Sequence, residues 1–522
     1  MISHSVNDSL SDDTLSELFD ELLILKQRIL SATENEMKHF SLEQTSESSW
    51  LSIFNVLNYV VMRREALHPL QSRLAQAGLS SLGRIEPHVI ANINSVLDVL
   101  SKAAFGKPYL DDNRRLFVDY HGGYRQLKQR AERLFGPPPE KRVEYIMVTM
   151  PTEAADDYDL VESLILAGMD DARINCAHDD PQVWEQMIAN IKRAMQLHQK
   201  DCRILMDLAG HKIRTGKVFA GKHKSEKPHK EHHKEKEQKK FPRLNYADWL
   251  ILYKDGENLS DVLTQFEEQV DVAVTCTYPD VIDLVEVGQS VWIDDGKIGT
   301  VIKEKNDRAL LLQVNRVGPK GARLKEEKGL NFPQTVLNLP TLSDKDRQDL
   351  EFVSRHADMV GLSFTENAQD VLNLREELAR LGREDLPILA KIETADAVRR
   401  LPEILVQSLA HDIDFGIMIA RGDLAVELGS VRMAEIQDEI LRLCEAAHVP
   451  VIWATQVLES LAKEGTISRP EISDAAMAQR AECVMLNKGA YVATAVTILS
   501  DVLQRMEAHQ CKSHTHMRAL HW

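Results

Sequence analysis

Eight short apolar runs recur between residues 143 and 487, and amphipathic stretches separate most of them. They read VEYIMVTM, DARINCA, RILMDL, DMVGLSF, PILAKI, FGIMIA, PVIWAT and CVMLN. Nearly continuous apolar runs are typical of strands that are buried on both faces of a parallel sheet. Eight such strands alternating with helices are what a (β/α)8 barrel requires. The sequence therefore predicts an α/β protein with a TIM barrel over residues 141–217 and 330–505.

One connection in this pattern is far longer than the others. About 150 residues separate the third run, which ends near Leu208, from the fourth, which starts near Asp358. A connection between neighbouring elements of such a barrel usually takes only roughly 2 to 6 residues. Residues 218–329 are therefore expected to form an inserted domain. Its later half alternates apolar and polar residues around turns such as Asp295-Gly296, which predicts a small antiparallel β unit that serves as a lid.

Residues 1–140 are predicted to form a separate helical region. Apolar residues recur at intervals of three and four over 12–32 and 86–104, and Pro137 to Pro139 end the helical pattern. Nothing in this region indicates chemistry, so we interpret it as a structural domain or an interface that could support a homo-oligomer. Residues 506–522 are expected to form a tail.

Composition narrows the classes of function. A formal net charge of −17 argues against a nucleic-acid surface, and no run approaches the ~18 apolar residues of a membrane span. The acidic N-terminus does not resemble a signal peptide, and six scattered cysteines indicate neither a disulfide framework nor a zinc site. We expect a cytoplasmic protein that acts on small molecules. The histidines of segment 222–240 and of the tail (His514, His516, His521) are interpreted as parts of solvated polar segments.

Polar residues follow most of the apolar runs, and on a barrel these strand ends would converge. They are Thr149, Arg173, Asn175, Asp207, Ser363, Lys391, Glu393, Asp423, Thr455 and Asn487. Carboxylates such as Glu393 and Asp423 are hard oxygen ligands suited to Mg²⁺ or Mn²⁺. Lys391 would stabilise developing negative charge, and Arg173 and Arg214 are suited to phosphate oxygens. The strand ends thus predict a site for a divalent metal and a phosphorylated substrate.

Several longer segments carry a family resemblance. ARINCAH, MDLAGHKIRTG, KEEKGLNFP, ILAKIET, MIARGDLAVELG and PVIWATQVLESL followed by SRPEISD occur in the order seen in the pyruvate kinase family. The chain resembles that family from about residue 143 to 505. The resemblance implies a glycolytic kinase that transfers a phosphoryl group from phosphoenolpyruvate to ADP, giving pyruvate and ATP with the help of Mg²⁺ or Mn²⁺.

The resemblance also implies roles for individual residues. Arg173, Lys391 and Thr455 would be catalytic, and these three would bind the substrate together with Gly422 and Asp423. Glu393 and Asp423 would hold the metal. The nucleotide would lie against His178, Arg214 and, from the lid, Lys328, with Asp295 nearby in the lid turn.

The family's monovalent-cation site is altered in this chain. The matching positions read Asn175, Ala177, Asp207 and Leu208, so two hydroxyl ligands are missing. Lys212 stands where potassium-dependent members have Glu, and its ammonium group can supply the missing positive charge. The sequence therefore predicts activity without potassium.

Other departures leave alternatives open. The first strand ends in TMPTEA and the eighth in NKGAY, where Asn487 replaces a serine that the family associates with proton transfer. Ala209 replaces a usual lysine and Glu366 a usual arginine. About 35 residues follow the eighth run, so regulation through the family's C-terminal domain is not expected. The alternatives are another metal-dependent lyase or aldolase that forms an enolate, or a non-catalytic sensor of phosphoenolpyruvate or nucleotide.

Overall fold

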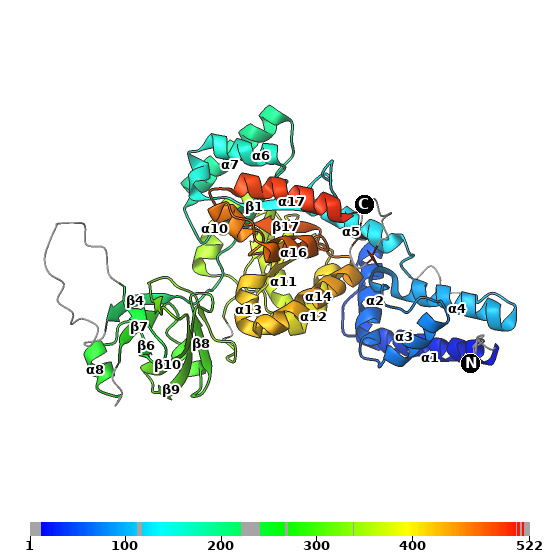
Figure 1. Cartoon of the computed structure of the whole chain (residues 1–522), viewed down its shortest axis with the longest axis horizontal. Coiled ribbons are helices and arrows are strands. Elements are labelled where there is room, and N and C mark those ends of the chain that lie inside the picture. The colour runs from blue at the N-terminus through cyan, green and yellow to red at the C-terminus, as the bar shows by residue number, and fades with distance from the viewer. Residues whose placement is uncertain are drawn as a thin grey trace, which may run out of the picture.

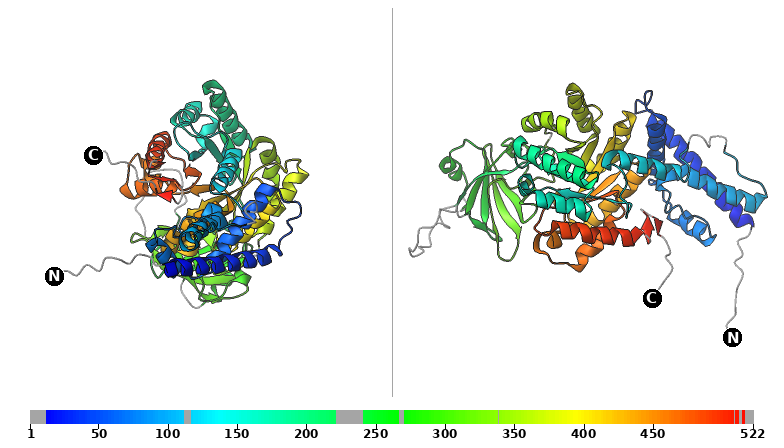
Figure 2. Two further views of the ribbon diagram at one scale, coloured as in Figure 1. Left: turned by 90° about the vertical axis from the view of Figure 1, so that its right-hand side faces the viewer. Right: turned by 90° about the horizontal axis from the view of Figure 1, so that it is seen from above.

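The computed structural model describes residues 12–111, 117–220, 241–266, 270–337, 339–507, 509–511 and 514–515. A barrel lies at the centre of the chain, the lid at one end and the N-terminal helices at the other (Figure 1). The view from above gives the same arrangement (Figure 2). The histidine-containing segment 222–240 and the side chains of His514, His516 and His521 lie outside the described part of the chain.

The central unit is a closed barrel of eight parallel strands, which confirms the predicted TIM barrel. Around the barrel the strands follow the order β1-β17-β16-β15-β14-β13-β3-β2. Their bounds are β1 Tyr145–Thr149, β2 Asp171–Asn175, β3 Arg203–Asp207, β13 Met359–Leu362, β14 Ile388–Ile392, β15 Phe415–Ala420, β16 Val451–Ala454 and β17 Cys483–Leu486. Each apolar run of the sequence analysis contains one of these strands.

Helices cover the outside of the barrel and alternate with its strands. They are α6 Tyr158–Ala167, α7 Pro181–His198, α10 Asp344–His356, α11 Ala368–Arg380, α12 Ala395–Ala410, α13 Arg421–Leu428, α14 Ser430–Ala447, α15 Glu459–Glu464, α16 Arg469–Ala478 and α17 Val492–Glu507. Several begin at a side chain that caps the helix. Ser343 and Asp346, for example, form a reciprocal capping box at the start of α10.

The lid is a seven-stranded sheet in the order β12-β8-β9-β10-β6-β7-β4. Its strands are β4 Thr215–Ala220, β6 Trp249–Tyr253, β7 Val272–Cys276, β8 Ser290–Ile293, β9 Ile298–Lys305, β10 Ala309–Val317 and β12 Leu330–Asn331. The expectation of a purely antiparallel unit is wrong in one place, because β6 and β7 run parallel. The short helix α8 Leu259–Leu263 lies between these two strands in sequence and supplies part of the crossover that a parallel pair needs.

The N-terminal helices are joined to the barrel by a buried polar contact. They are α1 Asp12–Met37, α2 Glu47–Met62, α3 His68–Gln76, α4 Val89–Phe105 and α5 Gly122–Phe135. The Asn55 side chain of α2 donates to the Ala446 carbonyl oxygen at 2.8 Å and to that of Glu86 at 2.7 Å. His448 lies between the Ser52 hydroxyl and the Pro87 carbonyl oxygen, each at 2.9 Å. Burial lowers the pKa of His448 to about 3, so its ring stays neutral.

Helix α5 fills the end of the barrel opposite the lid. Ala131, Leu134 and Phe135 belong to the same apolar cluster as Met147, Met418 and the other side chains of the barrel interior. A Cβ atom added to Gly416 on β15 would lie 2.8 Å from the Leu134 Cδ1 atom. The barrel core is therefore completed by a helix from the region that precedes it in sequence.

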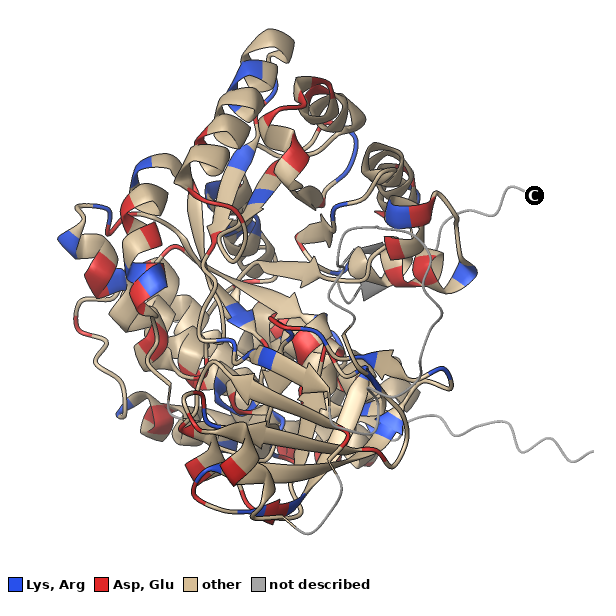
Figure 3. Ribbon diagram, turned by 90° about the vertical axis from the view of Figure 1, so that its left-hand side faces the viewer, with Lys and Arg blue, Asp and Glu red and all other residues tan. Residues whose placement is uncertain are grey.

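No helix in the described ranges combines the length and the hydropathy that a membrane span requires. On the side that carries the lid, Lys and Arg are interspersed with Asp and Glu (Figure 3). The five cysteines whose side chains are described are buried and form no disulfide with one another.

The packing of helix α5 into the end of the barrel can be tested with Leu134→Ala, which truncates a side chain that is only 1% exposed. We expect a loss of about 2 to 5 kcal/mol in the free energy of unfolding, because the change leaves a cavity in the barrel interior. Urea unfolding followed by circular dichroism measures this. Leu166→Ala on α6 is the matched control, since Leu166 is 55% exposed and should lose little stability. Equal losses in the free energy of unfolding for the two variants would contradict a role of Leu134 in the barrel core.

Candidate functional site

The predicted site residues meet at the C-terminal ends of the barrel strands. Pairing of β2 with β3 sets Asn175 beside Asp207, and pairing of β14 with β15 sets Lys391 beside Met418. Glu393 follows β14 directly, and Asp423 lies in the first turn of α13, directly after β15. The rigid barrel thus places these charges around one opening without help from flexible loops.

A buried network of charges forms the floor of the site. Arg173 donates to Asp207 Oδ2 at 2.9 Å through Nε and at 2.5 Å through Nη2, and to the Thr149 hydroxyl at 3.0 Å. The Lys391 ammonium group lies 3.4 Å from Asp207 Oδ2 and donates to Ser363 Oγ at 2.8 Å. Each charged group is at most 9% exposed, so each depends on its partners in place of water.

The protonation of this network follows from its contacts. Burial alone would raise the pKa of Asp207, but Lys391 and Arg173 hold it below its ordinary value. Burial would lower the pKa of Lys391, but Asp207 and Glu393 hold it above its ordinary value. Asp207 therefore stays ionised and Lys391 stays positively charged at neutral pH.

Glu393 and Asp423 form a carboxylate pair at the same opening. Glu393 Oε1 lies 3.2 Å from the Lys391 ammonium group, and its Oε2 accepts the Phe364 amide at 2.6 Å. Burial raises the pKa of Glu393; Lys391 opposes this rise, and the neighbouring charge of Asp423 adds to it. Carboxylate oxygens at one opening are chemically suited to a divalent cation that also binds substrate oxygens. The two side chains thus offer oxygen ligands of the kind that a divalent metal ion prefers.

Lys212 joins Asp423 to the lid. Its ammonium group lies 2.7 Å from Asp423 Oδ1 and 3.4 Å from Asp295 Oδ1 in the lid turn. Burial would lower the pKa of Lys212, but Asp423 and Asp295 hold it above its ordinary value. Lys212, Asn175 and Asp207 are the residues at the family's monovalent-cation site. Among the ion pairs of the described residues none joins Lys212 to Asp207. The Asn175 side chain accepts a hydrogen bond from the Ala177 amide at 3.1 Å.

The three predicted nucleotide-binding residues lie at different places near the opening. Arg214 lines the mouth cavity, which measures about 240 Å³ and is shared with Asp423 and Thr455. His178 lines an adjoining cavity of about 230 Å³ together with Lys488. Burial lowers the pKa of His178, and the positive charges of Lys488 and Arg214 lower it further. This second cavity is therefore a cationic environment suited to an anion.

Lys328 occupies the base of the lid. Its backbone amide donates to the Thr215 hydroxyl at 2.8 Å, and its ammonium group lies 3.0 Å from Asp294. The Glu327 carbonyl oxygen beside it accepts Arg214 Nη1 at 3.1 Å. Lys328 and Arg214 thus lie on adjacent segments where the barrel leads into the lid, joined by the bridge between Arg214 and Gly329. The Lys328 side chain points to the lid turn and lines neither cavity.

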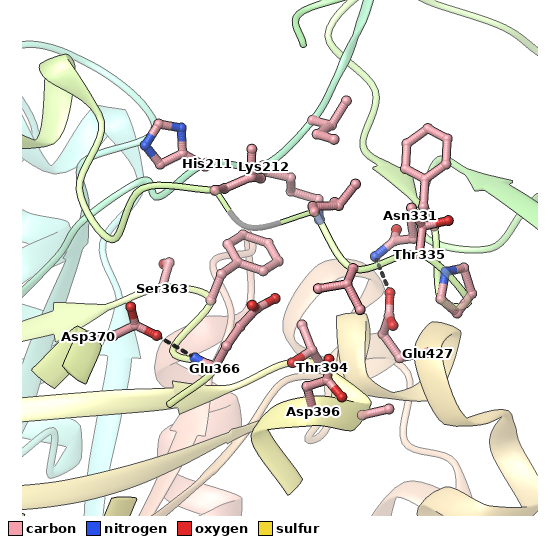
Figure 4. A pocket seen from close by; sticks show the side chains of 18 of the residues that line it. His211, Lys212, Asn331, Thr335, Ser363, Glu366, Asp370, Thr394, Asp396 and Glu427 are labelled. Atoms are coloured by element: carbon pink, nitrogen blue, oxygen red, sulfur yellow. Dashed lines mark hydrogen bonds between the residues drawn. The ribbon is translucent and has the colours of Figure 1, made fainter. Parts of the chain in front are cut away.

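Lid and barrel also meet around a pocket of about 510 Å³ on the far side of Lys212. At this pocket the Asn331 side chain of β12 donates a hydrogen bond through Nδ2 to Glu427 Oε1 of α13 at 3.3 Å (Figure 4). Glu366 lines the same pocket, so the residue at the family's arginine position faces this space. Burial raises the pKa of Glu427 to about 7, and Asp423 and Glu366 contribute to the rise.

Two features of the site were not predicted from the sequence: the contacts of Arg421 and the backbone conformation of Phe364 and Thr455. Arg421 donates to the Ala454 carbonyl oxygen at 3.0 Å and to both Asp474 oxygens at 2.5 and 2.8 Å, which ties the start of α13 to β16 and α16. Phe364 and Thr455 have positive φ angles of 54° and 65°. Such strain in residues other than glycine concentrates at functional sites. The Thr455 Oγ1 atom is buried and forms no hydrogen bond with the described residues.

Comparison with known proteins agrees with this geometry. Residues 141–254 and 246–496 match the family model described as pyruvate kinase, barrel domain. The chain is 31% identical to pyruvate kinase PKLR of Rattus norvegicus over 369 residues, which cover 68% of this chain and 58% of that protein. It is 32% identical to a pyruvate kinase of Dictyostelium discoideum, covering 66% and 62%, and 32% identical to one of Agrobacterium vitis, covering 68% and 67%.

The chain thus spans about three fifths of the length of the first of these relatives. The matched ranges contain all eight barrel strands and both halves of the charge network. The chain belongs to the pyruvate kinase family.

Proposed function

We propose that this chain transfers the phosphoryl group of phosphoenolpyruvate to ADP, giving pyruvate and ATP. The observation that carries the proposal is the buried contact of Lys391 with Asp207 and Glu393 beside Arg173. Two cations are held at one opening with a carboxylate pair next to them. This arrangement matches the charges of a phosphorylated carboxylic acid and a divalent metal.

The chemistry follows from where charge moves. The bond between phosphorus and the enol oxygen breaks, and a bond forms between phosphorus and a terminal oxygen of ADP. Negative charge passes to the enolate oxygen, and a proton then adds to the enolate carbon. Lys391, held positive by its neighbours, is placed to stabilise that charge, and Arg173 to hold the phosphoryl oxygens.

The substrate carboxylate would lie at the start of α13. The free amides of Gly422 and Asp423 begin this helix, where backbone N–H groups favour an anion. The unpaired Thr455 hydroxyl lines the same cavity and is available to donate a hydrogen bond. Glu393 and Asp423 would hold Mg²⁺ or Mn²⁺, which when bound supplies positive charge to the phosphoryl and carboxylate oxygens.

ADP would occupy the adjoining cavity beside His178, with Arg214 and Lys328 at the hinge of the lid. The contacts of this cavity with Arg173 support in-line transfer between the two spaces, since Arg173 lines both. Lys328 would have to leave Asp294 to reach the nucleotide, so its role requires movement within the lid. We also propose a cytoplasmic protein that forms a homo-oligomer.

The kinase reaction is tested by a coupled assay with phosphoenolpyruvate, ADP and Mg²⁺. We expect Lys391→Met to lower kcat by at least about 10²- to 10³-fold, because it removes charge stabilisation at the enolate oxygen. Lys192→Met on the exposed side of α7 is the matched control and should retain full activity. Circular dichroism checks that both variants fold.

Other outcomes of this assay favour the alternatives. Consumption of phosphoenolpyruvate without ADP would indicate an enolate-forming lyase or aldolase. Thermal stabilisation by phosphoenolpyruvate without turnover would indicate a sensor. The sensor is favoured by the end of the eighth strand. Asn487 stands there in place of the serine that the family associates with protonation of the enolate, and it lines both cavities.

Potassium independence gives a second test. We expect the same rate in potassium chloride and in tetramethylammonium chloride at equal ionic strength, because Ala177 and Leu208 offer no hydroxyl to a cation. Lys212→Gln should lower the rate in both salts, since it removes the positive charge beside Asp423. A rise of more than about tenfold on adding potassium to the unmodified protein would contradict the prediction, because it corresponds to more than ~1.4 kcal/mol of cation-dependent stabilisation.

A further inference from the structure

A large cavity lies at the end of the barrel opposite the lid. It measures about 840 Å³ and lies between α5 and the segments that lead into β1 and β17. Leu127 and Ala131 of α5 form one wall, and Glu144 and Tyr145 at the start of β1 form another. Its volume falls within the range of roughly 300 to 1,000 Å³ that is usual for ligand sites, which often lie between domains.

One buried carboxylate in this cavity lacks a counter-charge. Glu144 is 3% exposed, and its Oε1 accepts the Gln479 side chain at 3.0 Å. Its Oε2 atom is buried and accepts no hydrogen bond from the part of the chain that the structure describes. Burial raises the pKa of Glu144 to about 7, and the charges of Glu507 and Glu482 contribute to the rise. Burial makes the ionised form of this acid costly, and a ligand that supplies a cation would favour that ionised form.

The basic residues around the cavity do not fill this role. Arg142 is committed to Asp170 and to the Gly168 carbonyl oxygen. Lys128 lies 3.9 Å from Glu132 with 53% of its side chain exposed, and Lys141 is also exposed. Exposed charges are screened by water and salt, whereas the buried charge of Glu144 acts at lower effective dielectric. Arg142 is buried too, but its charge is paired with that of Asp170, whereas Glu144 forms no ion pair with the described residues. Lys128 and Lys141 are exposed to solvent.

Apolar side chains supply the remaining walls. Leu127, Ala131 and Ala481 are each at most 4% exposed and line the cavity together with Tyr145. A ligand here would bury a hydrocarbon portion against α5 while its charged end reaches Glu144. We propose that this cavity binds a small organic amine, with the ammonium group on Glu144 and the apolar portion against α5. The proposal goes beyond the phosphoryl transfer and does not depend on it, because the two cavities lie at opposite ends of the barrel.

The proposal is tested on the full chain by isothermal titration calorimetry with 1-aminobutane. Butan-1-ol and butyrate serve as neutral and anionic probes of similar shape. We expect only the amine to bind measurably. Glu144→Gln should weaken amine binding by roughly 10- to 100-fold, the usual loss when a hydrogen bond to a charged group is removed. Glu384→Gln, on the exposed surface between α11 and β14, is the matched control and should bind the amine as the unmodified protein does.

Two results would overturn the amine site. One is equal binding of amine and alcohol, and the other is undiminished amine binding by Glu144→Gln. If Glu144→Gln does not fold, Glu507→Lys replaces it, because Glu507 lines the cavity from the exposed end of α17. That variant should weaken amine binding, and unchanged amine binding would then reject the proposal. Calorimetry needs no turnover, so failure here is distinct from failure of the kinase assay.

Discussion

The Asp207 carboxylate holds the barrel mouth together. It accepts Arg173 from one side and lies within 3.4 Å of the Lys391 ammonium group on the other. All three are buried, so each would be costly without the others, and breaking such a network by removing one partner costs roughly 3 to 5 kcal/mol. The same contacts that make the network necessary for folding also fix two positive charges at a single opening. Stability and preorganisation for an anionic substrate therefore have one cause.

The lid is attached to this network by charge as well as by chain. Lys212 lies on the segment that leads from β3 into the lid, and it contacts Asp423 on the barrel and Asp295 on the lid. The Asp423 carboxylate thus contacts the Lys212 ammonium group and is also a proposed ligand of the metal. Binding of a metal and a substrate would redistribute these contacts, which links occupancy of the mouth to the position of the lid turn.

The sequence predicted the barrel well because its signal is local. Each strand is a continuous apolar run, and the residue that follows it faces the mouth whatever the surrounding loops do. The convergence of Arg173, Lys391 and Glu393 at the barrel mouth could therefore be predicted from their place at strand ends, while their roles stay a prediction. Arg421 escaped notice because its partner Asp474 lies 53 positions away in the chain, and no pattern within either segment indicates the pairing.

Contacts between distant segments explain the other misses. The parallel pairing of β6 with β7 depends on a crossover through α8, and the alternating pattern of strands looks the same in either direction. Residues 1–140 were predicted only as a helical region, and the apolar face of α5 does not say that its partner is the interior of a barrel. The positive φ of Phe364 likewise accompanies a contact between separate segments, because the Phe364 amide donates to Glu393, 29 positions further along the chain.

The position of α5 also bears on how the barrel assembles. This helix precedes every barrel strand in the chain, so it leaves the ribosome before any of them. β1 and β17, which must pair to close the barrel, are the first and last strands to appear, with the whole lid synthesised between them. Until β17 arrives, the earlier strands have an apolar helix to collect around, which shields their inward faces during the longest delay in synthesis.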